Sequence, residues 1–261
     1  MKDFSGKLAV ITGGGSGMGR ELARQLFMQG CNVAICDINQ DNMLETIRIC
    51  VAAGPQDTHI TAHQCDVSNE QEVLNFKDEV MQKHDRDHIN LLFNNAGIGG
   101  FFSFINDTRE EWERTFNICW YGVYYCSRAF VPLLVASDEG HLINTSSING
   151  FWASLGPRST NSSYSAAKFA VKGFTEALIN DFRLNAPHVK VSLVMPGHIG
   201  TSILDNTRTI MGAADTQALP AEKIAEIRES LVSKGVAVAS TSDDEIRKML
   251  KKRSDSFRDN A

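Results

Sequence analysis

Short apolar runs alternate with helix-like segments along most of the chain. The first run, KLAVIT at residues 7–12, stops at glycines, and GRELARQLFMQG after it has apolar residues at helical spacing. Five more runs continue the rhythm: NVAICD, HITAHQCDV, INLLFN, HLINTS and VKVSLV. The helices between them are expected near residues 40–53, 70–84, 110–135 and 163–184. Strands that alternate with helices build a parallel sheet covered on both faces, so we predict a doubly wound α/β fold.

The C-terminal part of the chain departs from this alternation. LPAEKIAEIRESLVSKG and SDDEIRKMLKKR have helical patterns, whereas VAVAS between them is short enough to be a loop. With 261 residues and 43% hydrophobic content, the chain can bury one large core. We predict a single domain over residues 1–261, with a core at 1–201 and a helical segment at 202–261. No strand is predicted after the sixth, which leaves that strand at an edge of the sheet.

Charge and cysteine content narrow the class of partner. The net charge of −5, without a Lys/Arg run before the C-terminal KMLKKR, disfavours nucleic acid or an anionic membrane as the main partner. The six scattered cysteines lack C-x-x-C pairs and the seven histidines lack metal-ligand spacing, so we expect buried thiols and no metal site. No leader or membrane-length apolar segment stands out. These features favour a cytoplasmic protein that acts on a small molecule.

The segment TGGGSGMGR, residues 12–20, lies between the first predicted strand and the first helix. Glycines there let the backbone turn tightly and approach a pyrophosphate, whose charge the N-terminal end of the helix would stabilise. The spacing T-G-x-x-x-G-x-G is neither the G-x-G-x-x-G pattern nor a P-loop. A plain structural turn is the alternative for an isolated glycine run, but this position favours dinucleotide binding.

Polar residues also stand at the carboxyl ends of later strands, where open α/β sheets bind ligands. Asp37 ends the second strand and is placed to accept hydrogen bonds from a ribose diol, with an ordinary helix cap as the alternative. Asp66 ends the third strand, NNAG follows the fourth and TSS ends the fifth. Each one alone is also typical of a simple turn. Together they predict a ligand site at one edge of the sheet.

Tyr164 and Lys168 lie four residues apart in the last predicted helix of the core. Residues at this spacing share one helix face, so the phenol and the ammonium can converge on one point. At about 4 Å and an effective dielectric of about 20, the ammonium would favour the phenolate by about 4 kcal/mol. Tyr164 is therefore a candidate acid-base catalyst, and an amphipathic helix surface is the alternative.

In this order, over about residues 7–201, the motifs resemble the short-chain dehydrogenase/reductase family in its single-domain, Rossmann-like form. The resemblance implies a catalytic set of Asn117, Ser147, Tyr164 and Lys168. It also implies an NAD-binding set of Gly13, Ser16, Gly17, Met18, Gly19, Asp37, Asp66, Val67, Asn95, Ala96, Gly97, Tyr164, Lys168, Pro196, Gly197, Ile199 and Thr201. Ser147, or less favourably Ser146, would bind the substrate oxygen, and Asn117 would anchor a water chain from Lys168. A homo-oligomer, dimer or tetramer, is implied as well.

The chain departs from the family pattern at two places. The loop between Ser147 and Tyr164 is longer than the family's, as if a short segment were inserted beside the substrate. The usual closing helix and strand are missing, so the C-terminus is either cut short or rebuilt, and residues 202–261 are expected to cover the substrate side as a lid. Trp112 and Trp120 are expected to be packing residues of the long helix.

The leading interpretation is an NAD-dependent oxidoreductase that interconverts a secondary alcohol and a ketone. Asp37 disfavours NADP because a carboxylate repels the ribose phosphate, and neither Ser16 nor DINQDN supplies a compensating cation. An NADP-dependent carbonyl reductase and a dinucleotide-binding sensor without turnover are the alternatives. The predicted pocket walls GIGGFFSFIN, INGFWASLGPR and TSILDNTRTIMG are rich in aromatic and aliphatic residues, which favours a hydrophobic substrate.

Overall fold

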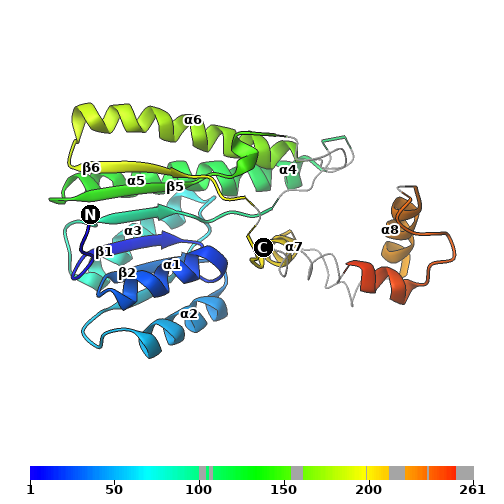
Figure 1. Ribbon diagram of the computed structural model, residues 1–261, viewed down its shortest axis with the longest axis horizontal. Coiled ribbons are helices and arrows are strands. Elements are labelled where there is room, and N and C mark those ends of the chain that lie inside the picture. The colour runs from blue at the N-terminus through cyan, green and yellow to red at the C-terminus, as the bar shows by residue number, and fades with distance from the viewer. Residues whose placement is uncertain are drawn as a thin grey trace. The chain divides into compact units, whose positions relative to one another are not determined.

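The computed structural model describes residues 1–99, 104–105, 108–153, 161–197, 199–211, 221–233 and 235–250. The chain divides into two compact units, Met1–Gly197 and His198–Ala261, and each is described by itself. In the first unit, one sheet lies between two layers of helices (Figure 1).

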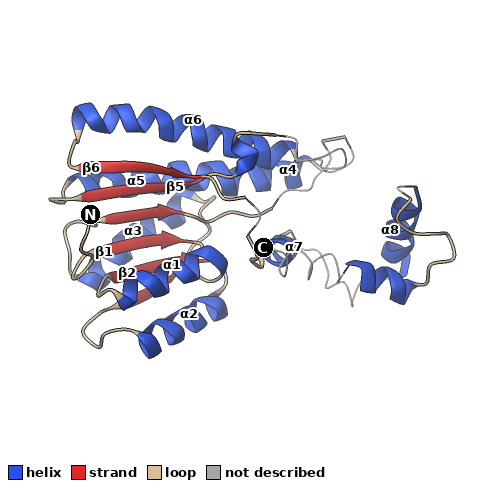
Figure 2. Cartoon of the chain, in the orientation of Figure 1, coloured by secondary structure: helices blue, strands red, loops and turns tan. Residues whose placement is uncertain are grey.

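Six parallel strands form the sheet in the order β3-β2-β1-β4-β5-β6 (Figure 2). The strands are β1 Leu8–Thr12, β2 Asn32–Asp37, β3 Ile60–Gln64, β4 Leu91–Asn94, β5 Gly140–Thr145 and β6 Val189–Val194. β2 and β3 are added on one side of β1, and β4, β5 and β6 are added on the other side. The boundary between β1 and β4 is therefore the switch point of a doubly wound fold. The predicted fold class is confirmed, and each of the six apolar runs forms a strand.

The helices pack in two groups. Helices α1 Gly17–Met28 and α2 Gln40–Ala53 pack against each other on one face of the sheet (Figure 1). The other face carries α3 Glu70–His84, which packs on α5 Gly122–Val135, and α6 Ser162–Asn185. The connection after β4 also forms α4 Arg109–Phe116, and the connection after β5 forms the short η2 Ile148–Gly150.

The core lies where the sheet meets these helices. Residues 8–11 of β1 are at most 1% exposed, because the central strand is covered on both faces. Phe27 of α1 and Met43 of α2 belong to the buried cluster on one face. On the other face, the rings of Phe76 and Phe130 meet edge to face, with their centroids 5.3 Å apart.

The predicted helix at residues 110–135 contains a π turn, η1 Asn117–Tyr121, between α4 and α5. A π turn closes i→i+5 hydrogen bonds and holds one residue more than an α turn. The apolar spacing of the sequence does not indicate it. The predicted helices at 40–53 and 70–84 match α2 and α3, and the one at 163–184 matches α6 within one residue at each end.

By length and composition, the stretch Arg109–Val135 is long and apolar enough to cross a membrane, so the expectation that no segment reaches this length was wrong. Half of its most apolar part is buried inside the protein. Because α5 packs on α3, β4 and β5, that apolar character is the one expected of a core helix.

The second unit is helical over most of its described residues, with α7 Ile203–Ile210, α8 Ala221–Ser233 and a helix over residues 243–250. VAVAS forms no helix or strand, as predicted. The predicted capping box is present: the Glu245 N–H donates to Ser242 Oγ (3.3 Å), and the Ser242 N–H donates to Glu245 Oε2 (2.8 Å). Pro220, predicted at the first turn of α8, lies outside the described residues. The lid role of this unit stays a prediction.

All six cysteines are buried and free, as expected. Burial raises the pKa of the Cys31 thiol to about 12 and that of the Cys50 thiol to about 11. Thiols with such values stay protonated near neutral pH and are poor nucleophiles.

A histidine pair beside the edge strand β3 makes stability depend on pH. His84 Nε2 and His63 Nε2 are each hydrogen-bonded to Thr61 Oγ1 (2.9 Å), and His63 Nδ1 is bonded to Glu79 (2.8 Å). Burial lowers the pKa of His84 from 6.5 to about 4. Burial also lowers the pKa of His63, although its bond to Glu79 opposes the shift.

Because the unfolded chain binds protons more readily at these sites, stability should fall as the pH drops from about 6.5 towards 4. Between pH 7 and pH 5 we expect His84 alone to account for a loss of about 1–2 kcal/mol in the free energy of unfolding. Urea unfolding at both pH values tests this, since His84→Gln should reduce the difference. The exposed His59→Gln should keep the full loss, and an unchanged pH dependence in His84→Gln would contradict the assignment.

Candidate functional site

The predicted site residues gather at the carboxyl edge of the sheet. Thr12 ends β1, Asp37 ends β2, Asn94 ends β4 and Thr145 ends β5. Because parallel strands end at the same edge, the loops that follow them lie together. The structure therefore brings the glycine turn and the NNAG and TSS segments to one side of the sheet.

Thr12 joins the glycine turn to the NNAG loop. Its Oγ1 accepts hydrogen bonds from the backbone N–H groups of Asn95 (3.0 Å) and Ala96 (2.9 Å). The Asn95 side-chain amide in turn donates to the Thr12 carbonyl (3.0 Å). These three bonds fix the two predicted cofactor-binding segments relative to each other.

Glycines keep this turn open to a ligand. Gly13 and Gly17 have φ of 67° and 52°, a region that other residues rarely adopt. A Cβ at Gly19 would lie 2.1 Å from the Gly13 carbonyl oxygen, so helix α1 can approach the turn only through glycine. Ser16 precedes α1 and Met18 lies in its first turn, which holds no acidic residue to offset the positive end of the helix. The turn and helix end fit a pyrophosphate.

Asp37 is held beside the glycine turn. Its carboxylate accepts hydrogen bonds from the N–H groups of Gly15 (3.0 Å) and Asn39 (3.1 Å). Neither bond caps α2, whose N-cap is Asn39, and both carboxylate oxygens keep lone pairs for a ribose diol. The nearby Arg20 donates to the Gly15 carbonyl and to Thr46 Oγ1 (3.1 Å), so its guanidinium is committed to the base of the turn.

Tyr164 and Lys168 lie one turn apart on α6, as predicted. Lys168 is only 3% exposed, and its Nζ donates a hydrogen bond to the Thr145 carbonyl (2.9 Å). The same Nζ lies 5.5 Å from the centroid of the Tyr164 ring. The ammonium is therefore held between the end of β5 and the phenol, next to the group that it was predicted to assist.

The two neighbouring serines differ in how their hydroxyls are used. Ser146 Oγ donates to the Lys168 carbonyl (2.7 Å), which commits its proton to holding α6 against β5. Ser147 Oγ accepts from the Asn149 N–H (3.2 Å), which leaves its own proton for another acceptor. Of the two, Ser147 has the hydroxyl that suits a substrate oxygen.

The π turn packs on α6, but the residue that it places beside Lys168 is Cys119. Cys119 Sγ donates to the Ile98 carbonyl (3.4 Å), and a Cβ at Gly97 would lie 3.7 Å from this sulfur and 3.5 Å from Lys168 Nζ. Asn117 is half-buried, and within the described residues its side chain makes no hydrogen bond. Its predicted role with Lys168 stays a prediction.

The loop after β6 is divided between the two units, so its residues are described unit by unit. The Pro196 carbonyl accepts from the Ile148 N–H (3.0 Å), which ties this loop to the segment that carries Ser147. Gly197 ends the first unit. In the second unit, the Thr201 N–H donates to the Ile199 carbonyl (2.8 Å), and the cofactor contacts predicted for these two residues stay predictions.

Two further side chains on α4 contact the site although the sequence did not single them out for it. Trp112, predicted to be a packing residue, donates from Nε1 to Ser162 Oγ (2.9 Å) at the start of α6, two residues before Tyr164. Arg114 forms an ion pair with Asp66 (2.8 Å). The contacts join elements far apart in the chain, so no local pattern indicates them. The sequence indicates only that an indole and a guanidinium need polar partners when they are partly buried, and it does not say which partners these are.

The predicted pocket walls fall only partly on described residues, because 100–103, 106, 154–158 and 212 of these walls lie outside them. In the second wall, Phe151 and Trp152 are 69% and 64% exposed and offer apolar surface next to η2.

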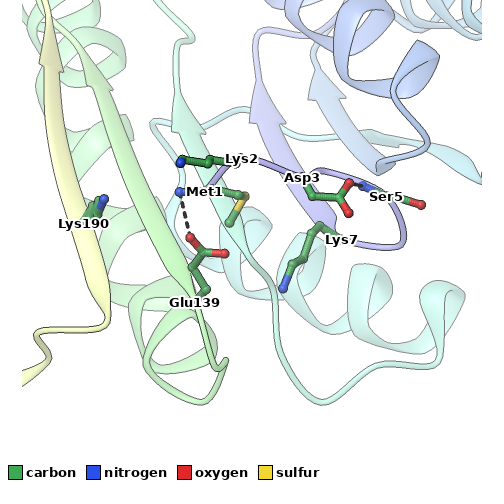
Figure 3. A pocket seen from close by; sticks show the side chains of 7 residues that line it. All are labelled: Met1, Lys2, Asp3, Ser5, Lys7, Glu139 and Lys190. Atoms are coloured by element: carbon green, nitrogen blue, oxygen red, sulfur yellow. Dashed lines mark hydrogen bonds and ion pairs between the residues drawn. The ribbon is translucent and has the colours of Figure 1, made fainter.

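A different pocket lies at the opposite edge of the sheet, near the amino ends of β1, β5 and β6 (Figure 3). The residues that line it are Met1, Lys2, Asp3, Ser5, Lys7, Glu139 and Lys190. The Met1 amine pairs with Glu139 (2.7 Å) inside it. None of the predicted site residues lines this pocket, so it is separate from the candidate site.

Comparison with known proteins agrees with this arrangement. The model of the short chain dehydrogenase family matches residues 7–211. SadH of Mycobacterium tuberculosis, whose name describes it as an oxidoreductase, is 37% identical over 83% of this chain and 75% of its own length. Human epidermal retinol dehydrogenase 2 is 32% identical over 80% of this chain and 65% of its own length.

A solved short chain dehydrogenase/reductase from Burkholderia phymatum, in complex with NAD, superposes with a TM-score of 0.73. It is 26% identical, and the match covers 99% of this chain and 89% of that one. Solved neighbours include complexes with NAD and with NADP or an NADP derivative. The chain therefore belongs to the short-chain dehydrogenase/reductase family of oxidoreductases.

Proposed function

We propose that the protein transfers a hydride between NAD(H) and a hydrophobic secondary alcohol or ketone, with Tyr164 as the acid-base catalyst. The observation that carries the proposal is the position of Lys168, whose Nζ is bonded to the Thr145 carbonyl (2.9 Å) and lies 5.5 Å from the Tyr164 ring. Membership of an oxidoreductase family supports the reaction class.

Each residue of the site has a separate task. A bound nicotinamide supplies or accepts the hydride. Tyr164 Oη gives a proton to the ketone oxygen or takes one from the alcohol, and Lys168 stabilises the phenolate by its charge. Ser147 donates a hydrogen bond to the substrate oxygen and so stabilises alkoxide character. The short Ser146 bond to the Lys168 carbonyl keeps α6 in register with β5.

The carboxylate of Asp37 supports NAD as the cofactor. A ribose phosphate carries about −1.5 to −2 charges, and at about 4 Å a carboxylate repels each unit by about 4 kcal/mol at an effective dielectric of 20. Solvent and side-chain rotation reduce this to roughly 1–3 kcal/mol, or about ten- to a hundredfold in affinity. Arg20, the nearby cation, already donates to the Gly15 carbonyl and Thr46.

Replacing Asp37 with serine should bring the kcat/KM values for NAD and NADP close to parity, because the repulsion disappears while no cation is gained. The measurement is the ratio of the two values with one substrate. Asp41→Ser is the control, since Asp41 is an exposed acid on the first turn of α2 and should leave the preference unchanged. A wild-type preference for NADP would show that Asp37 does not face the ribose.

The substrate class rests on the apolar character of the predicted walls. Phe151 and Trp152 present exposed rings beside the Ser147 segment. One relative is named a retinol dehydrogenase, an enzyme of a hydrophobic alcohol. A panel of neutral cyclic or aryl alcohols and ketones, and of short hydroxy acids, assayed with both cofactors tests the proposal. Faster turnover of carboxylate-bearing substrates than of neutral ones of equal size would contradict it.

A second candidate is an NADP-dependent carbonyl reductase, which the NADP complexes among the solved neighbours favour. A dinucleotide-binding sensor without turnover is the third, and it is disfavoured because Ser147, Tyr164 and Lys168 are all present. We propose a cytoplasmic homo-oligomer as the working form.

A further inference from the structure

Arg114 of α4 holds the loop that follows β3. Its guanidinium forms an ion pair with Asp66 Oδ2 (2.8 Å) and donates to Ser68 Oγ (2.7 Å). The two side chains of the ion pair are 33% and 25% exposed, so the pair is less screened than one on the open surface. A planar fork of N–H groups that reaches two acceptors fixes orientation as well as distance.

The other oxygen of Asp66 is fixed from within the loop. Oδ1 accepts from the Ser68 N–H (3.0 Å) and from Ser68 Oγ (2.7 Å). The Asp66 N–H donates to Glu72 Oε2 on α3 (2.8 Å). Both carboxylate oxygens and the backbone are therefore held, and the plane of the carboxylate cannot rotate freely.

Val67, between these residues, locks the loop against the start of α5. It is 6% exposed, and a Cβ at Gly122 would lie 2.7 Å from its Cγ2. The loop is thus clamped by α4 on one side and by the residue after the π turn on the other. The shape of this loop therefore depends on the long helix of α4, η1 and α5, which also packs on α6.

Hydrogen bonds from Ser68 and Arg114 together keep Asp66 an acceptor. Burial alone would raise the pKa of Asp66, but the hydrogen bonds from Ser68 and Arg114 hold it below its usual value. An ionised carboxylate accepts hydrogen bonds only, and its two oxygens offer about four lone-pair sites, so one remains for a ligand donor. The adenine of NAD carries an amino group, whereas a hypoxanthine in its place carries an oxo group.

We propose that Arg114 is a positioning residue for the adenine end of the cofactor. It fixes Asp66 as an acceptor for the adenine amino group, and the protein therefore distinguishes NADH from its deamino form. This inference rests on the proposed binding of a nicotinamide dinucleotide. It adds a specificity that depends on a residue of α4 rather than on the loop alone.

Equilibrium titration of NADH and of deamino-NADH, followed by calorimetry, tests the inference without turnover. Wild type should bind NADH about tenfold more tightly, the effect of one hydrogen bond to a charged group. Arg114→Met should lose most of this preference by weakening NADH binding, with deamino-NADH nearly unchanged. Arg114→Lys should keep part of it, because a point charge reaches one partner only.

Arg109→Met is the matched control, since Arg109 lies on the same helix and pairs with Glu113 (2.6 Å) on the surface. It should keep the full preference. Ser68→Ala removes the two hydrogen bonds of the Ser68 hydroxyl, to Asp66 and from Arg114, and leaves the ion pair. It should give a partial loss, which can be measured even if Arg114→Met does not fold. A wild type without preference, or folded Arg114 and Ser68 variants that keep the wild-type ratio, would overturn the proposal.

Failure of the proposed role of Arg114 can be distinguished from failure of the proposed reaction. A protein that discriminates the two nucleotides but turns over no alcohol or ketone would contradict the reaction and support the role of Arg114. An enzyme whose activity depends on Tyr164 but which binds both nucleotides equally would do the reverse.

Discussion

Replacing Tyr164 with phenylalanine is expected to lower kcat by about 10²–10⁴-fold, the contribution typical of a positioned acid-base group. The substitution removes only the phenolic oxygen, so the ring remains beside Lys168 Nζ, 5.5 Å from its centroid in the wild type. The affinity for NADH should stay within several-fold, because binding depends on the glycine turn and on Lys168, whose bond to Thr145 is not affected.

Steady-state kinetics and a separate NADH titration measure the two effects. Ser146→Ala is a useful comparison, because it removes the bond to the Lys168 carbonyl without touching a proton that the reaction uses. It should cost far less in kcat. If Tyr164→Phe retained more than about a tenth of wild-type kcat, the barrier would have risen by only about 1.4 kcal/mol, and Tyr164 would not be the catalyst.

Replacing Gly19 with alanine should abolish tight cofactor binding and lower the free energy of unfolding by about 1–3 kcal/mol. The new Cβ would lie 2.1 Å from the Gly13 carbonyl oxygen and 2.8 Å from the Asn95 side-chain amide. Neither can move without disturbing the bonds between Thr12 and the NNAG loop. Thermal unfolding and an NADH titration report the two losses.

Gly173→Ala is the matched control. Gly173 lies on α6, and a Cβ there would meet nothing within 4 Å. Alanine at this helix position should raise stability by roughly 0.5–1 kcal/mol and leave cofactor binding unchanged. If Gly19→Ala had the same stability and NADH affinity as Gly173→Ala, helix α1 would not approach the glycine turn as closely as the structure has it.

The strands and most helices were predictable because each has a local signal that its packing reinforces. β1 is apolar over residues 8–11 since both of its faces are covered, and α2 and α3 begin after asparagine caps, Asn39 and Asn69. The glycine turn was predictable for a similar reason, since the φ of 67° at Gly13 favours glycine. The placement of Tyr164 and Lys168 follows from helix periodicity alone.

What the sequence could not indicate are contacts between segments that are far apart. The bonds from Lys168 to Thr145, from Trp112 to Ser162 and from Arg114 to Asp66 each depend on how α4 and α6 settle on the sheet. The π turn was missed because it changes backbone pairing without requiring a particular residue type. Within this turn, Cys119 lies beside Lys168, and the predicted role of Asn117 with Lys168 stays a prediction.

The π turn gives the long helix one place where its length can change. Because a π turn holds one residue more than an α turn, deleting one residue within η1 should convert it to a regular α turn. The flanking helices α4 and α5 would then change little in orientation, so Trp112 and Arg114 would still face Ser162 and Asp66. The same deletion elsewhere in α4 or α5 would rotate one end of the helix by about 100° and break these contacts.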